Sequence, residues 1–309
     1  MRSYMIRRVG HSIFIVFGLM ALLFFATNIL GDPIELLLGD DATEEAAQAL
    51  RVKHGYDRPT YVRLAEYFAN FATGDFGRSL RYNVPARGLV LQNLPNTAAL
   101  AVVAWSIGMM GVPIGMLAAR RPRGIMDRVV NILSFAVISI PDFWLALMLI
   151  LIVALSLGLV PTSGFNGLGP DGWKFMILPA IALSPRVLGR NAQITRATMI
   201  DEMSKQYVAT ARAKGLAENV VLYRHVLKNA SISIVTLMGD ELAGFMNGAT
   251  VVEIIFAWPG LGKLLIDAIN ARDLPLITAT VFVVALMVMS INLFIDLAYT
   301  WLDPRIAYK

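Results

Sequence analysis

The chain has 309 residues, of which 57% are hydrophobic and 16% are charged, and its formal net charge is +5. Soluble domains have about 25% charged residues, and here the charges lie between long apolar blocks, so the composition excludes a soluble globular protein. Cysteine is absent, which excludes disulfides and thiolate chemistry. The histidines, His11, His54 and His225, lie in separate segments, so the sequence predicts no metal site. The basic residues flank apolar blocks, a distribution that indicates membrane topology rather than nucleic-acid binding.

Six apolar blocks predict an all-α, multi-pass membrane protein with about six transmembrane helices. The blocks lie near 9–30, 96–119, 129–158, 174–196, 229–252 and 276–301. Each approaches or exceeds the ~20 helical residues that cross a ~30 Å hydrocarbon core. The first block is too long for a signal-peptide core and lacks a following cleavage site, so residues 1–31 are predicted to be a retained transmembrane helix. Pro113, Pro141 and Pro179 lie inside blocks and are expected to kink helices.

Residues 32–95 predict an extracytoplasmic helical segment, and 96–309 a membrane core with five transmembrane helices. In the first, Asp41 can cap a helix that ends at Gly55, and Pro59 suits the first turn of a second helix. One face of that second helix is apolar and consists of Leu64, Tyr67, Phe68 and Phe71. Both a solvated surface helix pair and a cap that contacts a partner fit this pattern.

Basic residues predict that both termini are cytoplasmic. One set of connecting segments is rich in them: Arg2, Arg7 and Arg8, then Arg120, Arg121, Arg123 and Arg128, the stretch 196–228, and finally Arg305 and Lys309. The short segments of the other set, 159–173 and 253–275, contain only Lys263 and Arg272. Because short cytoplasmic loops are enriched in Lys and Arg, the first set is assigned to the cytoplasm.

The cytoplasmic loop 197–228 is polar but periodic. Its Ala-rich run from Tyr207 carries Arg212 and Lys214 before Gly215, which predicts a short helix with a C-terminal stop. A second helix through Val220–Leu227 would return the chain to the membrane. A short helix held out by two transmembrane helices is suited to contact another protein.

Tyr207–Gly215, followed by Arg224–Ala230, resembles the cytoplasmic loop of bacterial binding-protein-dependent ABC permeases of the dipeptide, oligopeptide and nickel group. Further resemblances to this group follow in chain order: Gly74–Ser79, Leu94–Thr97, Ile140–Trp144, Pro259–Gly262, Arg272–Pro275 and Asp303–Ile306. The general family loop pattern is E-A-A-x3-G-x9-I-x-L-P. Here Ala209-Thr210-Ala211 replaces E-A-A, His225 replaces Ile, and Leu227-Lys228 replaces L-P, so a carboxylate contact at position 209 is not available.

The resemblance implies a type I ABC importer permease in the bacterial cytoplasmic (inner) membrane, which carries peptides and is not itself an enzyme. It implies a pore shared with a homologous second permease, two ATP-binding subunits that hold ATP and magnesium, and an extracytoplasmic substrate-binding protein. The residues expected to couple to the ATPase are Tyr207, Ala209, Ala211, Arg212, Lys214, Gly215 and Leu216. Gly260–Lys263 is no P-loop, because Ala257 and Leu264 replace the required Gly and Ser/Thr.

Charged residues interrupt two apolar blocks, at Arg186 and Arg190 and at Asp240 and Glu241. A charge at mid-bilayer costs at least ~2.5 kcal/mol, so it normally faces protein or a wet cavity. Counting 1.5 Å per residue places Arg186 and Glu241 at depths roughly 6 Å apart. They are interpreted either as an interhelical ion pair, or a block end placed wrongly, or as lining of a route that meets the charged ends of a peptide.

Alternative functions remain. A nickel-chelate importer permease of the same family would need no metal ligands in this chain. A proton-coupled secondary transporter could use Glu241 or Asp296, but the inverted repeats typical of such proteins are not recognisable. Asn292 and Asp296, one turn apart, are otherwise expected to pack against neighbouring helices. An intramembrane enzyme would need a nucleophile–base–orienter set, and no spacing in the sequence indicates one.

Overall fold

The computed structural model describes residues 2–29, 48, 52 and 57–302. Apart from an isolated β-bridge between Arg78 and Pro85, all regular elements in these ranges are helices, which confirms the predicted all-α class. The chain divides into two compact units. Unit 1 comprises Met1–Tyr4, Pro95–Lys263 and Val288–Lys309, and unit 2 comprises Met5–Leu94 and Leu264–Met287.

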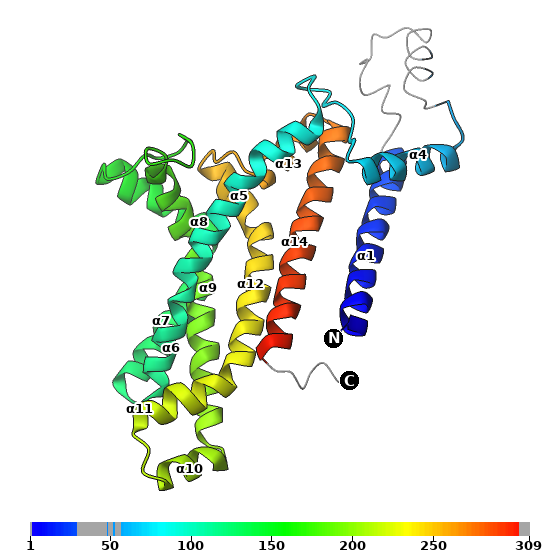
Figure 1. Ribbon diagram of the computed structural model, residues 1–309. Coiled ribbons are helices and arrows are strands. Elements are labelled where there is room, and N and C mark those ends of the chain that lie inside the picture. The colour runs from blue at the N-terminus through cyan, green and yellow to red at the C-terminus, as the bar shows by residue number, and fades with distance from the viewer. Residues whose placement is uncertain (1, 30–47, 49–51, 53–56, 303–309) are drawn as a thin grey trace. The chain divides into compact units, whose positions relative to one another are not determined.

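All six predicted apolar blocks fall on helices (Figure 1). In chain order these are α1 (Arg2–Ile29), α5 (Ala86–Met109) with α6 (Gly111–Ala119), α7 (Ile125–Ser139) with α8 (Asp142–Leu149) and the π-helix η1 (Ile150–Ser156), α9 (Trp173–Met203), α12 (Leu227–Ile255) and α14 (Leu274–Leu302). By length and hydropathy, two stretches of the described chain could each cross a membrane, Ala86–Ala119 and Leu274–Leu297, and the bent pair α7–α8 could form another span. At 1.5 Å per residue, α1, α9 and α12 also exceed the ~30 Å hydrocarbon core.

One predicted boundary was wrong, and one predicted kink is present. The helix of the second block begins at Ala86, ten residues before the predicted 96, and continues through Pro95. In the third block the kink expected at Pro141 is confirmed, because α7 and α8 meet there at an angle of 93°. Pro141 precedes α8, and Ile140 is extended (φ −82°, ψ 122°), the conformation that a following proline favours. By contrast, α9 passes through Pro179 and Pro185 without interruption.

Unit 2 contains the predicted second outer helix, α4 (Thr60–Thr73), which begins directly after Pro59 and ends at Gly74 in the left-handed conformation. Its apolar face is confirmed. Tyr67 packs against Phe24 of α1, and Phe71 packs against Phe282 of α14, with ring centroids 5.3 and 5.0 Å apart. The predicted cap at Asp41 and stop at Gly55 lie outside the described residues.

The segment after α4 joins two of the sequence motifs within unit 2. The Ser79 hydroxyl, in Gly74–Ser79, donates a hydrogen bond to the Asp273 carboxylate, in Arg272–Pro275. Asp273 is fully buried, and it also accepts from the backbone N–H of Arg81 at 3.2 Å and from that of Leu276 at 3.2 Å. Asp273 therefore both holds the segment that follows α4 and caps the first turn of α14.

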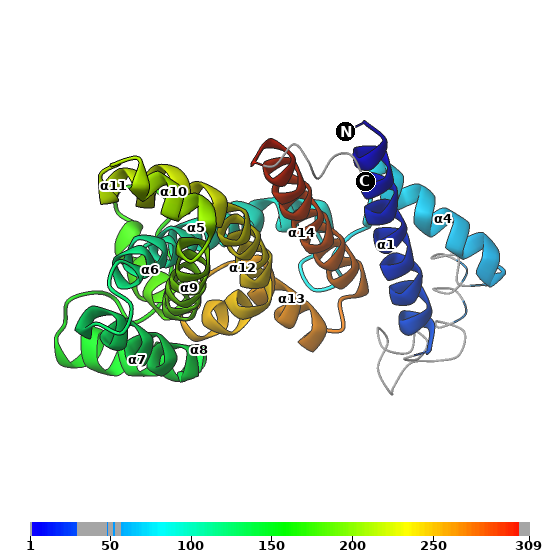
Figure 2. The same ribbon diagram turned by 90° about the horizontal axis from the view of Figure 1, so that it is seen from below.

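In unit 1, α9 is the central helix and contacts α6, α7, α8 and α12 (Figure 2). The contact with α6 is a close approach of two backbones. A Cβ placed on Gly111 would lie 2.9 Å from Cβ of Asn191, and one on Gly115 would lie 2.9 Å from Cβ of Thr195 and overlap the Ala192 carbonyl oxygen. Glycines four residues apart thus let α6 pack directly on α9.

Candidate functional site

The predicted cytoplasmic helix is present as α10 (Gln206–Ala213). It starts after the extended residue Lys205, and Gly215, at φ +75°, follows its end, which confirms the predicted stop. The short helix α11 (Glu218–Val220) and the π-helix η2 (Val221–Val226) then lead into α12, as predicted for the return to the membrane. α10 is therefore a short helix held between α9 and α12.

One face of α10 is packed against these two helices. Val208 is fully buried and Ala211 is 7% exposed. They belong to one apolar cluster with residues of α6, α9, η2 and α12, namely Ala119, Met199, Val221, Leu222, Val226, Ala230, Ile234 and Met238. Movement of α10 would therefore be transmitted to α9 and α12 through direct side-chain contact.

A buried carboxylate at the end of α9 adds a polar brace. Glu202 accepts a hydrogen bond from the Tyr207 hydroxyl at 2.7 Å and a charged hydrogen bond from Lys205. Glu202 is only 8% exposed, and charge-assisted hydrogen bonds are the stronger ones in proteins. Burial, and secondarily the Glu202 carboxylate, raises the pKa of Tyr207, so its hydroxyl remains the donor at neutral pH. This brace fixes the start of α10 relative to α9.

Of the seven residues predicted to couple to an ATPase, four lie on α10 and three follow its end. Tyr207 and Ala211 point inward. The other five are exposed: Ala209, Arg212, Lys214, Gly215 and Leu216. Arg212 donates to both carboxylate oxygens of Glu218, at 2.6 and 3.1 Å, which ties the end of α10 to α11 and lowers the pKa of Glu218. The exposed predicted residues of α10 and of the segment after it are thus Ala, Gly, Leu and two cations.

The charges inside the apolar blocks form ion pairs that differ from the predicted one. Arg190 donates to Glu241 at 2.7 Å, and the side chains are 51% and 2% exposed. Arg186, which depth counting had matched with Glu241, lies 3.8 Å from Asp142 of α8 instead. Asp240 is exposed. The difference of one helical turn arises because depth counting treats helices as straight and parallel, whereas α8 approaches α9 after the bend at Pro141.

A second buried carboxylate, Glu253, was missed by the sequence analysis. It is fully buried near the end of α12, and it accepts hydrogen bonds from the Thr97 hydroxyl at 2.7 Å and from the backbone N–H of Lys263 at 3.0 Å. Lys263 lies in the first turn of α13 (Leu261–Asn270), where a carboxylate is favoured by the free N–H groups and the helix dipole. Glu253 therefore caps α13.

The same network joins the motifs Leu94–Thr97 and Pro259–Gly262. The backbone N–H of Leu261 donates to the Thr97 hydroxyl at 2.7 Å, and Asn96 donates to the Pro259 carbonyl at 2.8 Å. Trp258 in turn donates to the Asn96 carbonyl at 3.1 Å. A charged residue at the end of an apolar block, just before a glycine-rich turn, was the available signal for this site.

Asp127 and Arg196 form another ion pair. The sequence analysis read Arg196 only as the start of a basic stretch and did not consider Asp127. Arg196 donates to both oxygens of Asp127, one bond measuring 2.9 Å, and the Arg123 N–H donates to the same carboxylate at 2.7 Å. The pair connects α7 to α9. Across the described part of the chain, no group of three or more His, Cys, Asp or Glu residues is placed to hold a metal ion.

Comparisons with known proteins agree on one family. The profile described as "Binding-protein-dependent transport system inner membrane component" matches residues 111–308. The oligopeptide transport system permease protein AppB of Bacillus subtilis (strain 168) is 37% identical over 316 residues, which cover all of both chains. The glutathione transport system permease protein GsiC of Escherichia coli (strain K12) is 35% identical over 312 residues, again covering both chains fully.

Solved structures resemble the fold. A chain of the MetNI methionine ABC transporter, described as inward facing, aligns with a TM-score of 0.56 at 17% identity, and the alignment covers 70% of this chain and 96% of that one. An amino acid ABC transporter solved with histidines aligns with a TM-score of 0.54 at 16% identity, over 69% of this chain and 93% of that one. These likenesses confirm the predicted fold, which is that of type I ABC importer permeases.

Proposed function

Because the chain belongs to the binding-protein-dependent transport system inner membrane component family of ABC permeases, we propose that it is a pore-forming permease subunit of an ATP-driven importer of short peptides. The observation that carries the proposal is the full-length 37% identity to an oligopeptide permease, together with a braced, outward-facing α10. Family membership removes the proton-coupled secondary transporter and the intramembrane enzyme as alternatives.

The substrate class rests on the relatives. One is named for oligopeptides and another for glutathione, a tripeptide, and both match over their whole length. Peptides of a few residues are therefore favoured over a nickel chelate. The receptor that delivers the substrate would set which peptides are accepted.

In this proposal, α10 is the helix that enters a groove of an ATP-binding subunit. Its exposed residues Ala209 and Arg212, with Lys214, Gly215 and Leu216 directly after it, would make the contact. Val208 and Ala211 would transmit the movement to α9 and α12. The small side chain of Ala209 supports close approach of another surface. The partners would be a homologous second permease, two ATP-binding subunits that hold ATP and magnesium, and an extracytoplasmic substrate-binding protein.

The first role that we assign to Arg190 is to neutralise the buried charge of Glu241. Glu241 is buried and Arg190 covers it, so the pair lowers the cost of a carboxylate inside an apolar block. The half-exposed guanidinium of Arg190 retains N–H donors that a peptide carboxylate could approach. Uptake measured with Arg190→Lys and with Glu241→Gln tests whether the pair also lines the route.

Co-purification tests the proposal directly. The tagged full-length chain would be extracted from its native membrane in mild detergent, and its companions identified by mass spectrometry. We expect a second permease and P-loop ATPases. The variant Ala209→Trp should reduce ATPase recovery at least about tenfold, whereas Ala72→Trp, an equally exposed alanine of α4, should not. Recovery of the chain without any ATPase, or equal recovery with both variants, would contradict the proposal.

The proposed orientation, with both termini and α10 cytoplasmic, can be tested separately. The chain contains no cysteine, so single cysteines report location without background. Ala209→Cys should react with a membrane-impermeant maleimide only in inside-out vesicles, and Ala72→Cys only in right-side-out vesicles. The reverse pattern would invert the topology.

A further inference from the structure

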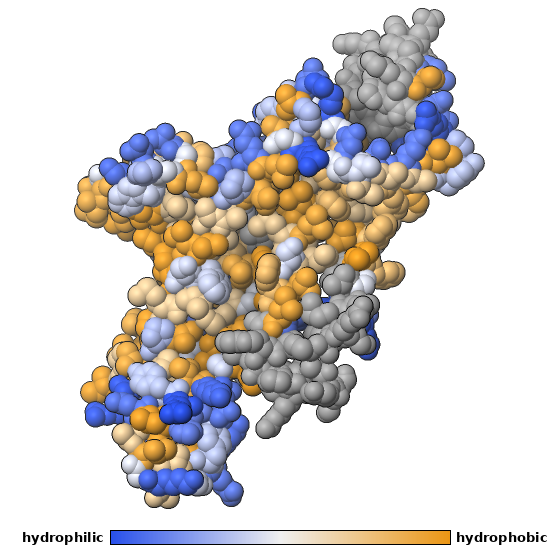
Figure 3. Space-filling model, viewed as in Figure 1, coloured by the Kyte–Doolittle hydropathy of each residue, from blue (hydrophilic) through white to orange (hydrophobic). Residues whose placement is uncertain are grey.

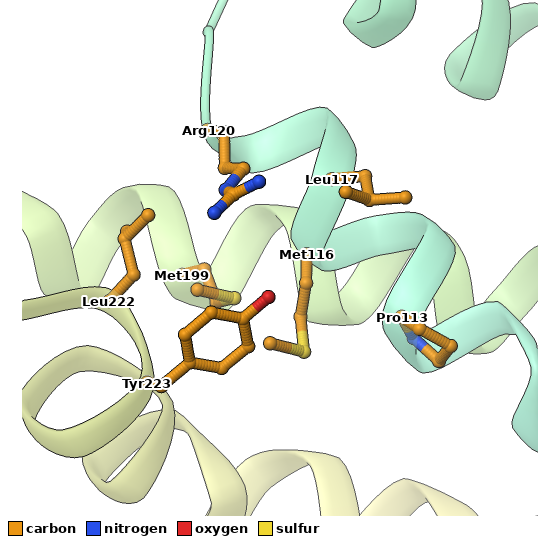
Figure 4. A pocket seen from close by; sticks show the side chains of 7 residues that line it. All are labelled: Pro113, Met116, Leu117, Arg120, Met199, Leu222 and Tyr223. Atoms are coloured by element: carbon orange, nitrogen blue, oxygen red, sulfur yellow. The ribbon is translucent and has the colours of Figure 1, made fainter. Parts of the chain in front are cut away.

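A pocket of about 300 Å³ lies in unit 1 near the start of η2. Six of the side chains that line it are apolar or aromatic: Pro113, Met116, Leu117, Met199, Leu222 and Tyr223. The seventh is Arg120, whose guanidinium extends from the end of α6 toward the pocket (Figure 4). The lining thus combines an apolar interior with a single cation.

Arg120 is held by uncharged groups. It donates a hydrogen bond to the Asn219 side-chain oxygen, and its guanidinium lies 5.9 Å from the centre of the Tyr223 ring. By contrast, Arg196 and Arg212 are each paired with a carboxylate. Within the described residues no ion pair neutralises Arg120. Since a guanidinium carries five N–H donors, several remain available to an anion.

The mouth of the pocket lies where the surface changes from apolar to polar. Leu117 and Tyr223 are 44% and 51% exposed. The next residues along the chain include the exposed Arg121 and Arg123. Figure 3 shows hydrophilic side chains gathered around the end of unit 1 that carries α10, with hydrophobic side chains along the helices beyond it. In a membrane protein, such a boundary coincides with the level of the lipid headgroups.

We propose that this pocket binds one anionic phospholipid of the adjacent leaflet, with its phosphate on Arg120 and part of an acyl chain against Met116, Met199 and Leu222. The size fits, because 300 Å³ holds about ten groups of ~30 Å³, the volume share of a water molecule and close to that of a methylene. The charge fits as well, since basic pockets between transmembrane helices at this level bind acidic headgroups.

Because of the position of the pocket, a bound lipid would connect two segments of the chain. Leu222 and Tyr223 belong to η2, which connects α11 to α12, whereas Pro113, Met116 and Leu117 belong to α6. A bound acyl chain would therefore contact both segments and oppose their separation. The proposal concerns lipid binding alone and stands independently of the transported substrate.

Native mass spectrometry of the purified full-length chain tests the proposal. Dioleoyl phosphatidylglycerol and dioleoyl phosphatidylcholine would be titrated in parallel, because they differ in headgroup charge but not in acyl chains. We expect one phosphatidylglycerol to be retained at least about fivefold more than phosphatidylcholine, the ratio that one basic contact supplies. Arg120→Gln should abolish this preference, and Arg128→Gln, the same change at an exposed arginine at the start of α7, should preserve it.

A second variant tests the apolar part of the site without altering charge. Leu117→Trp places a larger side chain at the mouth and should lower retention of both lipids about threefold or more. Equal preference in Arg120→Gln and Arg128→Gln would overturn the proposal, since only general surface charge would then act. Displacement of phosphatidylglycerol by millimolar inorganic phosphate would also overturn it, by indicating a site for soluble phosphate. Failure of phosphatidylglycerol to remain bound to the unaltered chain would overturn it as well.

Discussion

The contact between α6 and α9 makes opposite predictions for the same substitution at two glycines. Gly115 lies against the Ala192 carbonyl and Thr195. By contrast, among the described residues no heavy atom outside the neighbouring backbone of α12 lies within 4 Å of a Cβ placed on Gly244. Gly115→Ala should therefore destabilise the protein. Gly244→Ala should stabilise it, because alanine is favoured over glycine in a helix by roughly 0.5–1 kcal/mol.

The magnitude follows from the geometry. A Cβ on Gly115 would lie 2.9 Å from Cβ of Thr195. A favourable contact between two carbon atoms has a separation of about 3.5–4.0 Å. The obstacle includes backbone, so the helices must separate by about 1 Å, and overpacking of this kind costs about 1–3 kcal/mol. We take the upper end and subtract the gain in helix propensity, which leaves a loss of about 2 kcal/mol for Gly115→Ala. The two variants should thus differ by about 3 kcal/mol.

Thermal unfolding in detergent at one fixed scan rate measures this difference. Since about 1 kcal/mol shifts the midpoint by about 2–4 °C in chains of 150–250 residues, the two midpoints should differ by at least about 5 °C. The scan rate is held constant because unfolding of membrane proteins is often irreversible. A midpoint for Gly115→Ala equal to or above that of the unaltered chain would refute the close approach of α6 and α9.

Three further predictions concern the buried carboxylates. Arg190→Gln should cost about 2–3 kcal/mol of stability, because it leaves buried Glu241 unpaired. Glu241→Gln should cost about 1 kcal/mol or less. Equal losses of stability for the two variants in thermal unfolding would contradict this difference. Tyr207→Phe removes the hydrogen bond to Glu202, so it should lower peptide uptake per ATP hydrolysed in proteoliposomes, while Tyr61→Phe, at an exposed tyrosine of α4, should leave that ratio unchanged. Glu253→Gln should cost about 1–3 kcal/mol of stability, since an amide has only one acceptor oxygen for the Thr97 and Lys263 donors. Thermal unfolding midpoints measure this loss, with Thr97→Ser as the conservative control.

Local signals explain the parts of the fold that the sequence predicted. The six apolar blocks fall on helices because hydropathy reports burial in lipid whatever the tertiary contacts are. α10 and its stop were predicted because alanine propensity and Gly215 act within one or two turns. The kink at Pro141 was predicted from the proline itself, whereas its angle of 93° depends on tertiary packing and could not be derived from hydropathy. Hydropathy also missed the first ten residues of α5, where Arg87, Gln92 and Asn93 interrupt the apolar pattern.

The partners of the charged residues could not be derived in the same way. Glu253 and Thr97 are 156 residues apart in the sequence, and the sequence around either residue does not indicate that the other is its partner. Arg186 was matched with the wrong carboxylate because its partner, Asp142, comes from a helix that the bend redirects. The sequence did indicate that a charge in an apolar block needs a partner, which is the correct physical requirement. Which partner it finds depends on tertiary packing.

The hydrogen bond between Ser79 and Asp273 has a consequence for biogenesis. The two residues are 194 apart, so at about 5–20 residues per second the ribosome needs about 10–40 s to make the second after the first. During that interval, Tyr67 and Phe71 lack Phe282, whose ring contacts Phe71 in their aromatic cluster. The nascent chain thus exposes these aromatic side chains until its last helix has been synthesised. Chains interrupted before that helix are expected to be substrates for membrane chaperones and proteases.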